Sequence, residues 1–435
     1  MGNATTASVT GVQVAPAKSA IRDLPIAKVW AFAVGQFGWA LLSGIISNWL
    51  VYFYQPDQET ISQGQTVFVP QGLVVLGIVT VVGGITAFAR FFDAFVDPAV
   101  ASLSDRCDAK SGRRMPFLKF AALPLAVVTV LVFWSPINGT SWVNAAFLFV
   151  TVIGYYIALT FYCTPYNALI AELGHDSKQQ LTISTAISFT WVAGTAIAYV
   201  APVIWGAFVP MMGITAIRVT FTIMAAVAFV CMLVPPLAIR EKDYVNSHPT
   251  SESTIESLKQ TFGDGEFRKF VCSDVVYWVA ITTFQTGLPF FVTSLLKLPE
   301  TTTTIYFVLM TGVSVLFYLP VNILANKVGK KRLLLVAFVI FTCAFAFAGA
   351  LGSAVLGFIP AMAQGLVLSV VGAIPMAAFG ILPQAIVANI ADASSKTTGQ
   401  DRQGMFYAAR TFAMKMGQSV AMLLFTGVST IGMAS

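Results

Sequence analysis

The chain has 435 residues, of which 57% are hydrophobic and only 10% are charged, and its mean hydropathy is +0.79. Soluble domains carry roughly 25% charged residues, so this composition excludes an ordinary soluble enzyme, a nucleic-acid-binding protein and a disordered chain. The 33 glycines fit a polytopic helical membrane protein, in which glycine is unusually frequent. The five cysteines and two histidines have no disulfide-framework or zinc-site spacing, so no metal or prosthetic cofactor is predicted.

Residues 1–24 are predicted to form a polar N-terminal tail, because they have neither the basic start nor the apolar core of a signal peptide. Eleven later segments contain the about 20 mostly apolar residues that a membrane-spanning helix needs. They are residues 28–54, 71–100, 116–135, 142–172, 183–206, 216–239, 266–296, 302–325, 332–352, 358–390 and 404–432.

Lysine and arginine gather in alternate loops between these segments. They precede the first segment and fill the loops after the second, sixth, eighth and tenth, whereas the other loops contain Lys297 alone. Because basic loops stay in the cytoplasm, we predict a multi-pass protein of the cell (inner) membrane with a cytoplasmic N-terminus. The net charge of +6 therefore reflects topology and not nucleic-acid binding.

The two halves of the chain repeat each other. Asp105 and its basic loop reappear as Asn326 and its basic loop at an offset of 221, and Pro165 reappears as Pro383 at an offset of 218. The repeat predicts an N-terminal six-helix bundle over 25–240, a cytoplasmic connector with a short amphipathic helix over 241–265, and a C-terminal bundle over 266–435 with five helices. A repeat of helix 216–239 would begin beyond residue 434, so we expect the twelfth helix to be absent from this chain.

Charged residues stand inside the predicted second helix, at Arg90, Asp93 and Asp97. Each buried acid costs about 2.5–3.5 kcal/mol at the centre of a span. Acids four residues apart share one helix face, where their repulsion requires a shared cation or a shared proton. The alternative is a neutralised packing cluster of Arg90, Asp93, Asp97 and a basic partner. Lys415 of the last helix is expected to pair with Asp93 or Asp97, and its own alternative is to reach the cytoplasmic interface. An intramembrane aspartyl protease is disfavoured, because its acids would face each other from two helices.

Together with the six-plus-six plan, these residues resemble a known transporter family. The chain is similar to the melibiose-permease-like glycoside–pentoside–hexuronide:cation symporters of the major facilitator superfamily. The similarity lies in the run Arg90, Asp93, Asp97 and Pro98, in the basic loop after it, and in the stretches 164–169, 391–392 and 402–417. The resemblance implies an all-α fold of two pseudo-symmetric six-helix bundles that works as a monomer. It also implies a symporter that moves a small organic solute, a sugar or glycoside, with H+ or Na+ by alternating access, and no enzymatic activity.

The resemblance assigns roles to individual residues. The cation site falls on Asp93, Asp97 and Thr160, and its coupling partners are Arg90, Thr411 and Lys415. Val96 stands where the melibiose carrier has an amide ligand, so protons and sodium both stay open as the coupling ion. A gating loop, expected to hold the halves together in the outward-facing state, contains Asp105, Arg106, Arg113 and Arg114.

The sugar side departs from the family. Ala40, Cys163, Asn167 and Ala186 occupy positions where the melibiose carrier has residues that bind its sugar, which puts a galactoside in doubt and keeps a lysolipid or other amphiphile symporter as the alternative. A non-transporting receptor is disfavoured, since it would not need the two acids. Polar and aromatic residues near the expected cavity are the candidates for solute binding: Gln36, Asn48, Tyr162, Tyr166, Asn167, Trp191 and Trp278.

Overall fold

The computed structural model describes residues 23–57, 61, 65–72, 79–105, 107, 109, 111–174, 177–213, 215–245, 259, 261–398 and 403–429. Regular structure in this part of the chain is helical. The α-helices are α1 (Ile26–Tyr54), α3 (Val81–Asp105), α4 (Met115–Val132), α5 (Trp142–Leu173), α6 (Ser177–Tyr199), α7 (Ala201–Met212), α8 (Thr215–Ala238), α10 (Gly265–Phe290), α11 (Thr301–Val328), α12 (Lys330–Ala350), α13 (Ala361–Thr398) and α14 (Gln403–Val428). Short turns of other helix types are η1 (Glu241–Asp243), η2 (Phe291–Leu295) and η3 (Ala354–Leu356).

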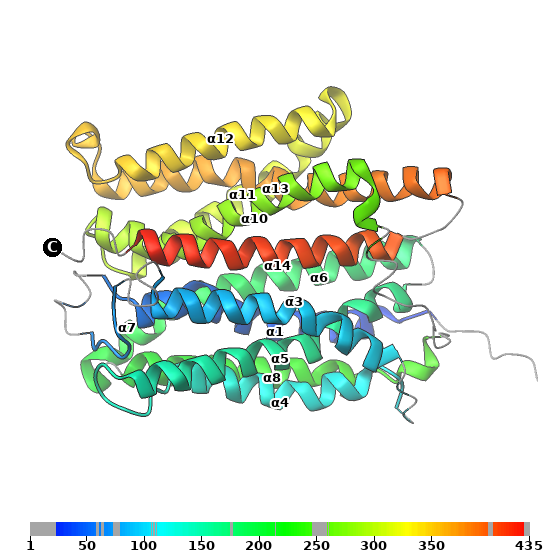
Figure 1. Ribbon diagram of the computed structural model, residues 1–435, viewed down its shortest axis with the longest axis horizontal. Helices are drawn as coiled ribbons and strands as arrows, with labels where there is room; N and C mark the ends of the chain where they lie inside the picture. The colour runs from blue at the N-terminus through cyan, green and yellow to red at the C-terminus, as the bar shows by residue number, and fades with distance from the viewer. Residues whose placement is uncertain are drawn as a thin grey trace, which may run out of the picture.

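The long helices lie side by side along the length of the molecule (Figure 1). Nine segments of the described chain are long and apolar enough to cross a membrane, and one of these, Thr182–Met212, joins α6 and α7. Helices α3 and α14 have 25 and 26 residues. At a rise of about 1.5 Å per residue they are also long enough to cross a membrane, although both contain charged residues. Each of the eleven predicted segments thus coincides with a long helix or helix pair in the described chain.

Some predicted boundaries are wrong. The helix expected over 71–100 begins only at Val81, where the Thr80 hydroxyl accepts a hydrogen bond from the Gly83 amide (3.0 Å), and it continues to Asp105. The helix expected over 183–206 is interrupted after Tyr199, because Pro202 starts a new first turn and cannot donate to the preceding one.

Most of the connector expected to form an amphipathic helix lies outside the described residues. Its described end shows Asp264 as the N-cap of α10, because its carboxylate accepts hydrogen bonds from the amides of Glu266 (2.9 Å) and Phe267 (3.0 Å).

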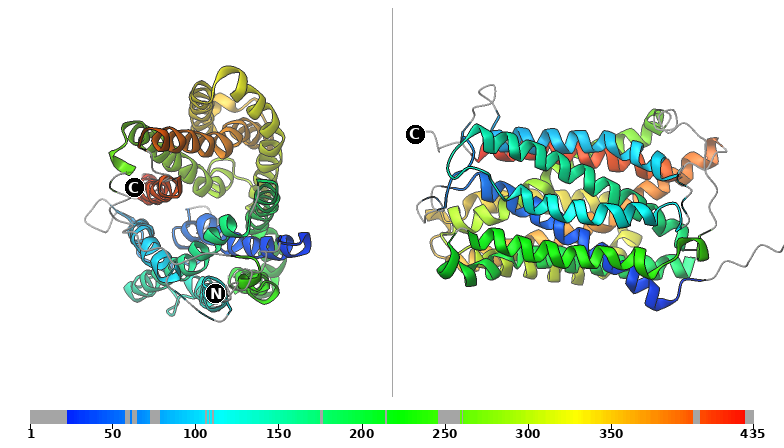
Figure 2. Two further views of the ribbon diagram at one scale, coloured as in Figure 1. Left: turned by 90° about the vertical axis from the view of Figure 1, so that its right-hand side faces the viewer. Right: turned by 90° about the horizontal axis from the view of Figure 1, so that it is seen from below.

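The helices pack in two groups, which Figure 2 shows end-on. In one, α1 packs on α6 and α8, α4 on α5 and α8, and α3 on α5; in the other, α10 packs on α14 and α13 on α11 and α12. We call them the N-terminal and C-terminal bundles, and α3 against α14 is the main contact between them.

Close approach of helices needs glycine: a Cβ on Gly38 would lie 2.6 Å from the Ala228 carbonyl oxygen, and one on Gly194 would lie 2.6 Å from that of Phe37. The exact domain boundaries stay a prediction.

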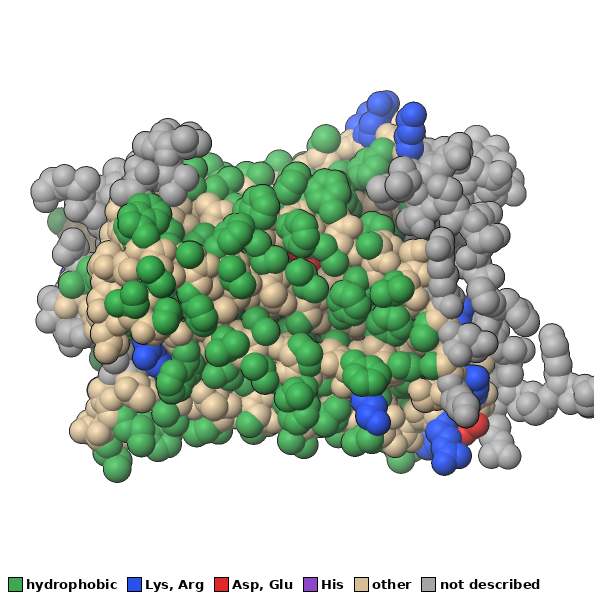
Figure 3. All heavy atoms as spheres, turned by 60° about the horizontal axis from the view of Figure 1, so that its bottom comes forward, with side chains coloured by type: hydrophobic (Ala, Val, Ile, Leu, Met, Phe, Trp, Pro, Cys, Tyr) green, Lys and Arg blue, Asp and Glu red, His purple; other side chains and the backbone are tan. Residues whose placement is uncertain are grey.

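The middle of the surface is hydrophobic, and most of the Lys and Arg in Figure 3 gather at one end. Side chains such as Phe120 (77% exposed) and Leu316 (74% exposed) would be costly in water and fit a lipid environment. The chain is therefore a multi-pass membrane protein. We call the end with residues 111–114 the basic end and the other the opposite end; α1 begins at the basic end and α14 finishes at the opposite end (Figure 2).

Candidate functional site

Two carboxylates on α3 meet one lysine from α14. The Lys415 ammonium lies 2.6 Å from a carboxylate oxygen of Asp93 and 2.6 Å from one of Asp97. The side chain of Asp93 is 4% exposed, that of Asp97 23% and that of Lys415 16%. The four-residue spacing places both acids on one face of α3, and this face points to the C-terminal bundle. The ammonium supplies the positive charge that two neighbouring carboxylates require.

Helix α5 contributes a matching pair of hydroxyls. Thr160 donates a hydrogen bond to Asp93, and Thr164 donates one to Asp97 (3.1 Å). Pro165 follows directly and has no amide hydrogen to donate within α5. The sequence pointed to Thr160 but not to Thr164, whose four-residue spacing from Thr160 repeats that of the acids. Two carboxylates and two hydroxyls form a set of oxygen ligands that a proton or a hard cation can use.

Arg90 lies one turn before Asp93 but bonds elsewhere. Its guanidinium donates to Gln418 on α14 and to Ser47 on α1 (3.3 Å), and lies 5.4 Å from the centroid of the Tyr156 ring. These partners are neutral, so Arg90 joins α3 to α1 and α14 without competing with Lys415 for the acids.

Thr411, the other predicted coupling residue, is apart from this cluster. Its side chain is exposed and donates to the carbonyl of Tyr407 in its own helix (3.0 Å). The structure therefore brings together Asp93, Asp97, Thr160 and Lys415, but not Thr411.

Two aromatic residues predicted to bind a solute pack inside the N-terminal bundle. The fully buried Tyr162 donates to the carbonyl of Met232 (2.9 Å), and the fully buried Tyr166 donates to that of Phe32 (2.7 Å). Tyr166 also stacks on the Phe32 ring, with centroids 4.3 Å apart. These contacts hold α5 against α1 and α8, so the geometry gives both tyrosines a packing role.

The other predicted solute-binding residues are dispersed. Gln36 and Asn48 on α1 are buried, and the Oε1 and Nδ2 atoms respectively have no hydrogen-bond partner. Asn167 is exposed, Trp191 is 40% exposed, and Trp278 is half-buried on α10. The two amides of α1 thus combine a buried side chain with an unused polar atom, and the indole nitrogen of the half-buried Trp278 is a further buried polar atom without a hydrogen-bond partner.

Two arginines of the predicted gating loop form ion pairs inside the N-terminal bundle. Arg113 and Arg114 form ion pairs with Glu172 at the end of α5, at 3.0 and 2.7 Å. The side chain of Asp105 and the whole of Arg106 lie outside the described residues. These described ion pairs join α4 to α5, and the role of the loop in gating stays a prediction.

A connector residue that the sequence analysis did not single out completes this loop. The Glu241 carboxylate accepts hydrogen bonds from the amides of Arg113 (3.0 Å), Arg114 (2.8 Å) and Met115 (3.0 Å). It thereby caps the positive N-terminus of α4. Gly112 makes room for it, since it adopts φ = +123° and a Cβ there would lie 2.3 Å from a Glu241 oxygen.

A second buried ion pair lies wholly in the C-terminal bundle. The Arg410 guanidinium on α14 donates to both oxygens of Asp274 on α10, at 3.0 and 3.1 Å. Both residues are buried, at 8% and 3% exposed. No short-range motif predicts this pair, because its members are 136 residues apart in the chain.

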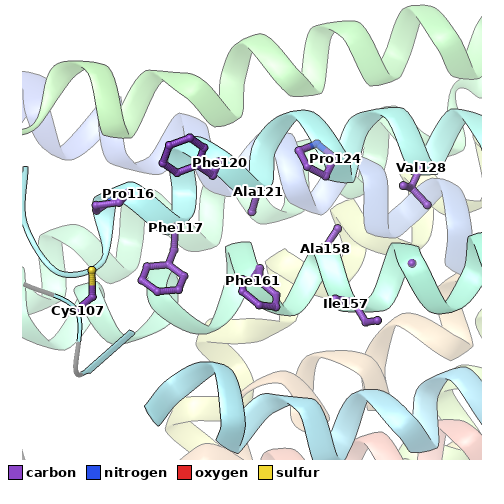
Figure 4. Close-up of a pocket in the computed structure, with 11 residues that line it drawn as sticks. Cys107, Pro116, Phe117, Phe120, Ala121, Pro124, Val128, Ile157, Ala158 and Phe161 are labelled. Carbon is purple, nitrogen blue, oxygen red and sulfur yellow. The ribbon is translucent and has the colours of Figure 1, made fainter. Parts of the chain in front are cut away.

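An apolar hollow of about 530 Å³ opens between α4 and α5 (Figure 4). Cys107 and Pro116 line the part nearest the basic end, and Phe120, Val128 and Phe161 line much of the rest. Its lining contains none of the residues predicted to bind the cation or the solute. The hollow is suited to a hydrocarbon chain.

A family model described as "MFS/sugar transport protein" matches residues 31–434. Curated relatives include "Uncharacterized symporter YnaJ" of Bacillus subtilis, 23% identical over 42% of this chain and 36% of the relative. They also include "Inner membrane symporter YicJ" of Escherichia coli, 26% identical over 50% of this chain and 47% of the relative, and the isoprimeverose transporter of Lactiplantibacillus pentosus, 24% identical over 40% and 33%. The matched parts thus cover about half or less of these relatives' own lengths.

Solved structures share the fold. The nucleoside transporter NupG is similar with a TM-score of 0.60 at 14% identity, over 93% of this chain and 96% of NupG. The inward-open xylose transporter XylE from Escherichia coli is similar with a TM-score of 0.58 at 16% identity, over 92% and 88%. At these identities the likeness shows the architecture of the major facilitator superfamily.

Proposed function

We propose that this chain carries a small organic solute across the membrane together with a cation. The chain belongs to the MFS/sugar transport protein family, and so to the glycoside–pentoside–hexuronide:cation symporters that its helix motif resembles. The family is one of transporters and not of enzymes, as the sequence predicted. The coupling ion and the solute are parts of the proposal.

The observation that carries the proposal is the place of Lys415. Its ammonium lies between two acids of the other bundle, at 2.6 Å from each, where a bound monovalent cation would also neutralise them. A proton or Na+ that enters this oxygen-lined site releases Lys415 from both carboxylates. Because Lys415 belongs to the C-terminal bundle and the acids to the N-terminal bundle, release of the lysine changes the contact between bundles that alternating access requires.

A sugar or glycoside is the solute that the relatives favour. They include the isoprimeverose transporter, a "Putative glycoside/cation symporter" and a "Glucuronide carrier protein homolog", the last two of Escherichia coli. The buried amides Gln36 and Asn48, each with an unused polar atom, are the α1 groups we propose for sugar hydroxyls. The apolar hollow between α4 and α5 favours the alternative, a lysolipid or other amphiphile as the solute.

The proposal includes an orientation and an oligomeric state. We place the protein in the inner membrane as a monomer, with the basic end in the cytoplasm, because basic loops stay on that side. One relative carries "inner membrane" in its name.

A thermal-shift screen of the purified protein tests this function. Sugars, glycosides and lysolipids are added with Na+ or with choline, at two pH values. We expect a sugar or glycoside to raise the melting temperature more when Na+ or extra protons are present. Stabilisation by a lysolipid alone would select the alternative, and a ligand effect independent of both ions would contradict coupling.

A further inference from the structure

At the opposite end, two acids join the bundles in a crossed arrangement. Asp57, just after α1, accepts hydrogen bonds from Thr293 (2.8 Å) and Ser294 on η2 of the other bundle. Glu300, at the start of α11, accepts hydrogen bonds from Tyr52 on α1 and Trp205 on α7. Each acid is thus held by donors of the other bundle, and we call Asp57 with Glu300 the carboxylate clasp.

Other contacts close the same end around the clasp. Gln55 donates to the carbonyl of Thr426 (3.0 Å) and to the Ser429 hydroxyl (2.7 Å), both at the end of α14. A Cβ on Gly83 would lie 1.9 Å from the Thr426 hydroxyl, so α3 and α14 also meet closely here. Together with the clasp, these described contacts hold the two bundles together at the opposite end.

The clasp contains a carboxyl group that takes up a proton more readily than an ordinary glutamic acid does. Burial, with a smaller contribution from the Asp57 charge, raises the pKa of Glu300 from 4.5 to about 7. Its Oε2 atom is buried and has no hydrogen-bond partner. Around it stand Tyr52 from α1, Trp205 from α7 and the Asp57 carboxylate, while Lys297 of the same loop is exposed to solvent.

We propose that the carboxylate clasp is a pH-dependent gate, in which protonated Glu300 closes the opposite end and ionised Glu300 opens it. The gate is separate from the cation site on α3 and does not depend on which solute is carried. It adds to the transporter a response to the acidity of the compartment that the opposite end faces.

The direction follows from the two states of Glu300. When the clasp opens, the carboxyl returns to water and to its ordinary pKa of 4.5, whereas in the closed state the pKa is about 7. Closing is thus fully favoured below pH 4.5 and is lost as the pH rises through 7. The ratio of open to closed molecules changes by on the order of 100-fold across this window if the burial is complete, and we expect at least about tenfold.

Hydrogen exchange followed by mass spectrometry on the intact protein in nanodiscs measures this opening. Peptides that contain residues 49–57 and 296–307 are compared at several pH values, after correction for the intrinsic exchange rate. Wild-type protection should fall at least about tenfold between pH 5 and pH 8. Glu300→Gln, which keeps the shape of the neutral acid, should stay protected throughout.

Two further variants keep the test decisive. Glu266→Gln removes an exposed acid at the basic end and should keep the wild-type profile. Asp57→Asn removes the nearby charge and should move the midpoint to lower pH even if Glu300→Gln does not fold. Wild-type protection that does not change with pH, or a Glu300→Gln profile equal to the wild type, would overturn the gate while leaving the proposed symport intact.

Discussion

Removal of Lys415 should make the coupling cation bind much more tightly. In the wild type, a cation that enters between Asp93 and Asp97 must displace an ammonium that lies 2.6 Å from each. Breaking a buried ion pair costs about 3–5 kcal/mol, and the 23% exposure of Asp97 argues for the low end. Since about 1.4 kcal/mol is a factor of ten in affinity, Lys415→Ala should lower the dissociation constant of the cation by roughly 100-fold.

The assay is a thermal-shift titration of wild type and Lys415→Ala with Na+ in a choline background, repeated as a pH titration. Lys415→Ala should melt at a lower temperature without the cation and recover with it. Arg410→Met is the matched control, because it leaves the buried Asp274 without its partner but creates no pair of acids. The reasoning is refuted if Lys415→Ala and wild type have the same cation midpoint, or if Arg410→Met is rescued equally by Na+.

Two further variants test the oxygen ligands and the cap at the basic end. Thr160→Val removes the hydroxyl that donates to Asp93. It should weaken the apparent cation affinity about fivefold to tenfold, since such a bond contributes about 1 kcal/mol. An unchanged midpoint in the same titration would exclude Thr160 as a ligand. Glu241→Ala leaves three amides at the start of α4 without their acceptor. It should lower the unfolding free energy by about 1–2 kcal/mol, as measured by denaturant unfolding in detergent. Lys242→Ala, at the neighbouring exposed position, should not lower the unfolding free energy.

The positions of the spans could be predicted because each is a long apolar run. Boundaries failed where a single residue decided them: Thr80 starts α3 late, and Pro202 divides Thr182–Met212 into two helices. Neither effect changes the hydrophobicity of the segment.

The meeting of Asp93, Asp97 and Lys415 was predictable for a physical reason, since acids inside a membrane need a counter-charge. The direction in which Tyr162 and Tyr166 point could not be predicted. Helix α5 is apolar around most of its circumference, so the sequence does not tell which of its sides faces a cavity. Short-range motifs do not predict pairs that form between distant parts of the chain. Asp274 and Arg410, for example, lie 136 residues apart.

Glu300 was missed because its chemistry depends on burial by another bundle. Its neighbours in the chain are loop residues, and nothing in them indicates that Tyr52 and Trp205 surround the carboxylate. Only the packed structure distinguishes this acid from an exposed one.

The most direct measurement of the central claim is solute uptake into proteoliposomes driven by an imposed Na+ or proton gradient. Wild type, Asp93→Asn and Asp97→Asn are compared, with Glu266→Gln as the control for loss of an unrelated carboxylate. Wild type and Glu266→Gln should concentrate the solute above its external concentration, whereas Asp93→Asn and Asp97→Asn should fold but should not concentrate it. Undiminished concentrative uptake by Asp93→Asn and Asp97→Asn would contradict it.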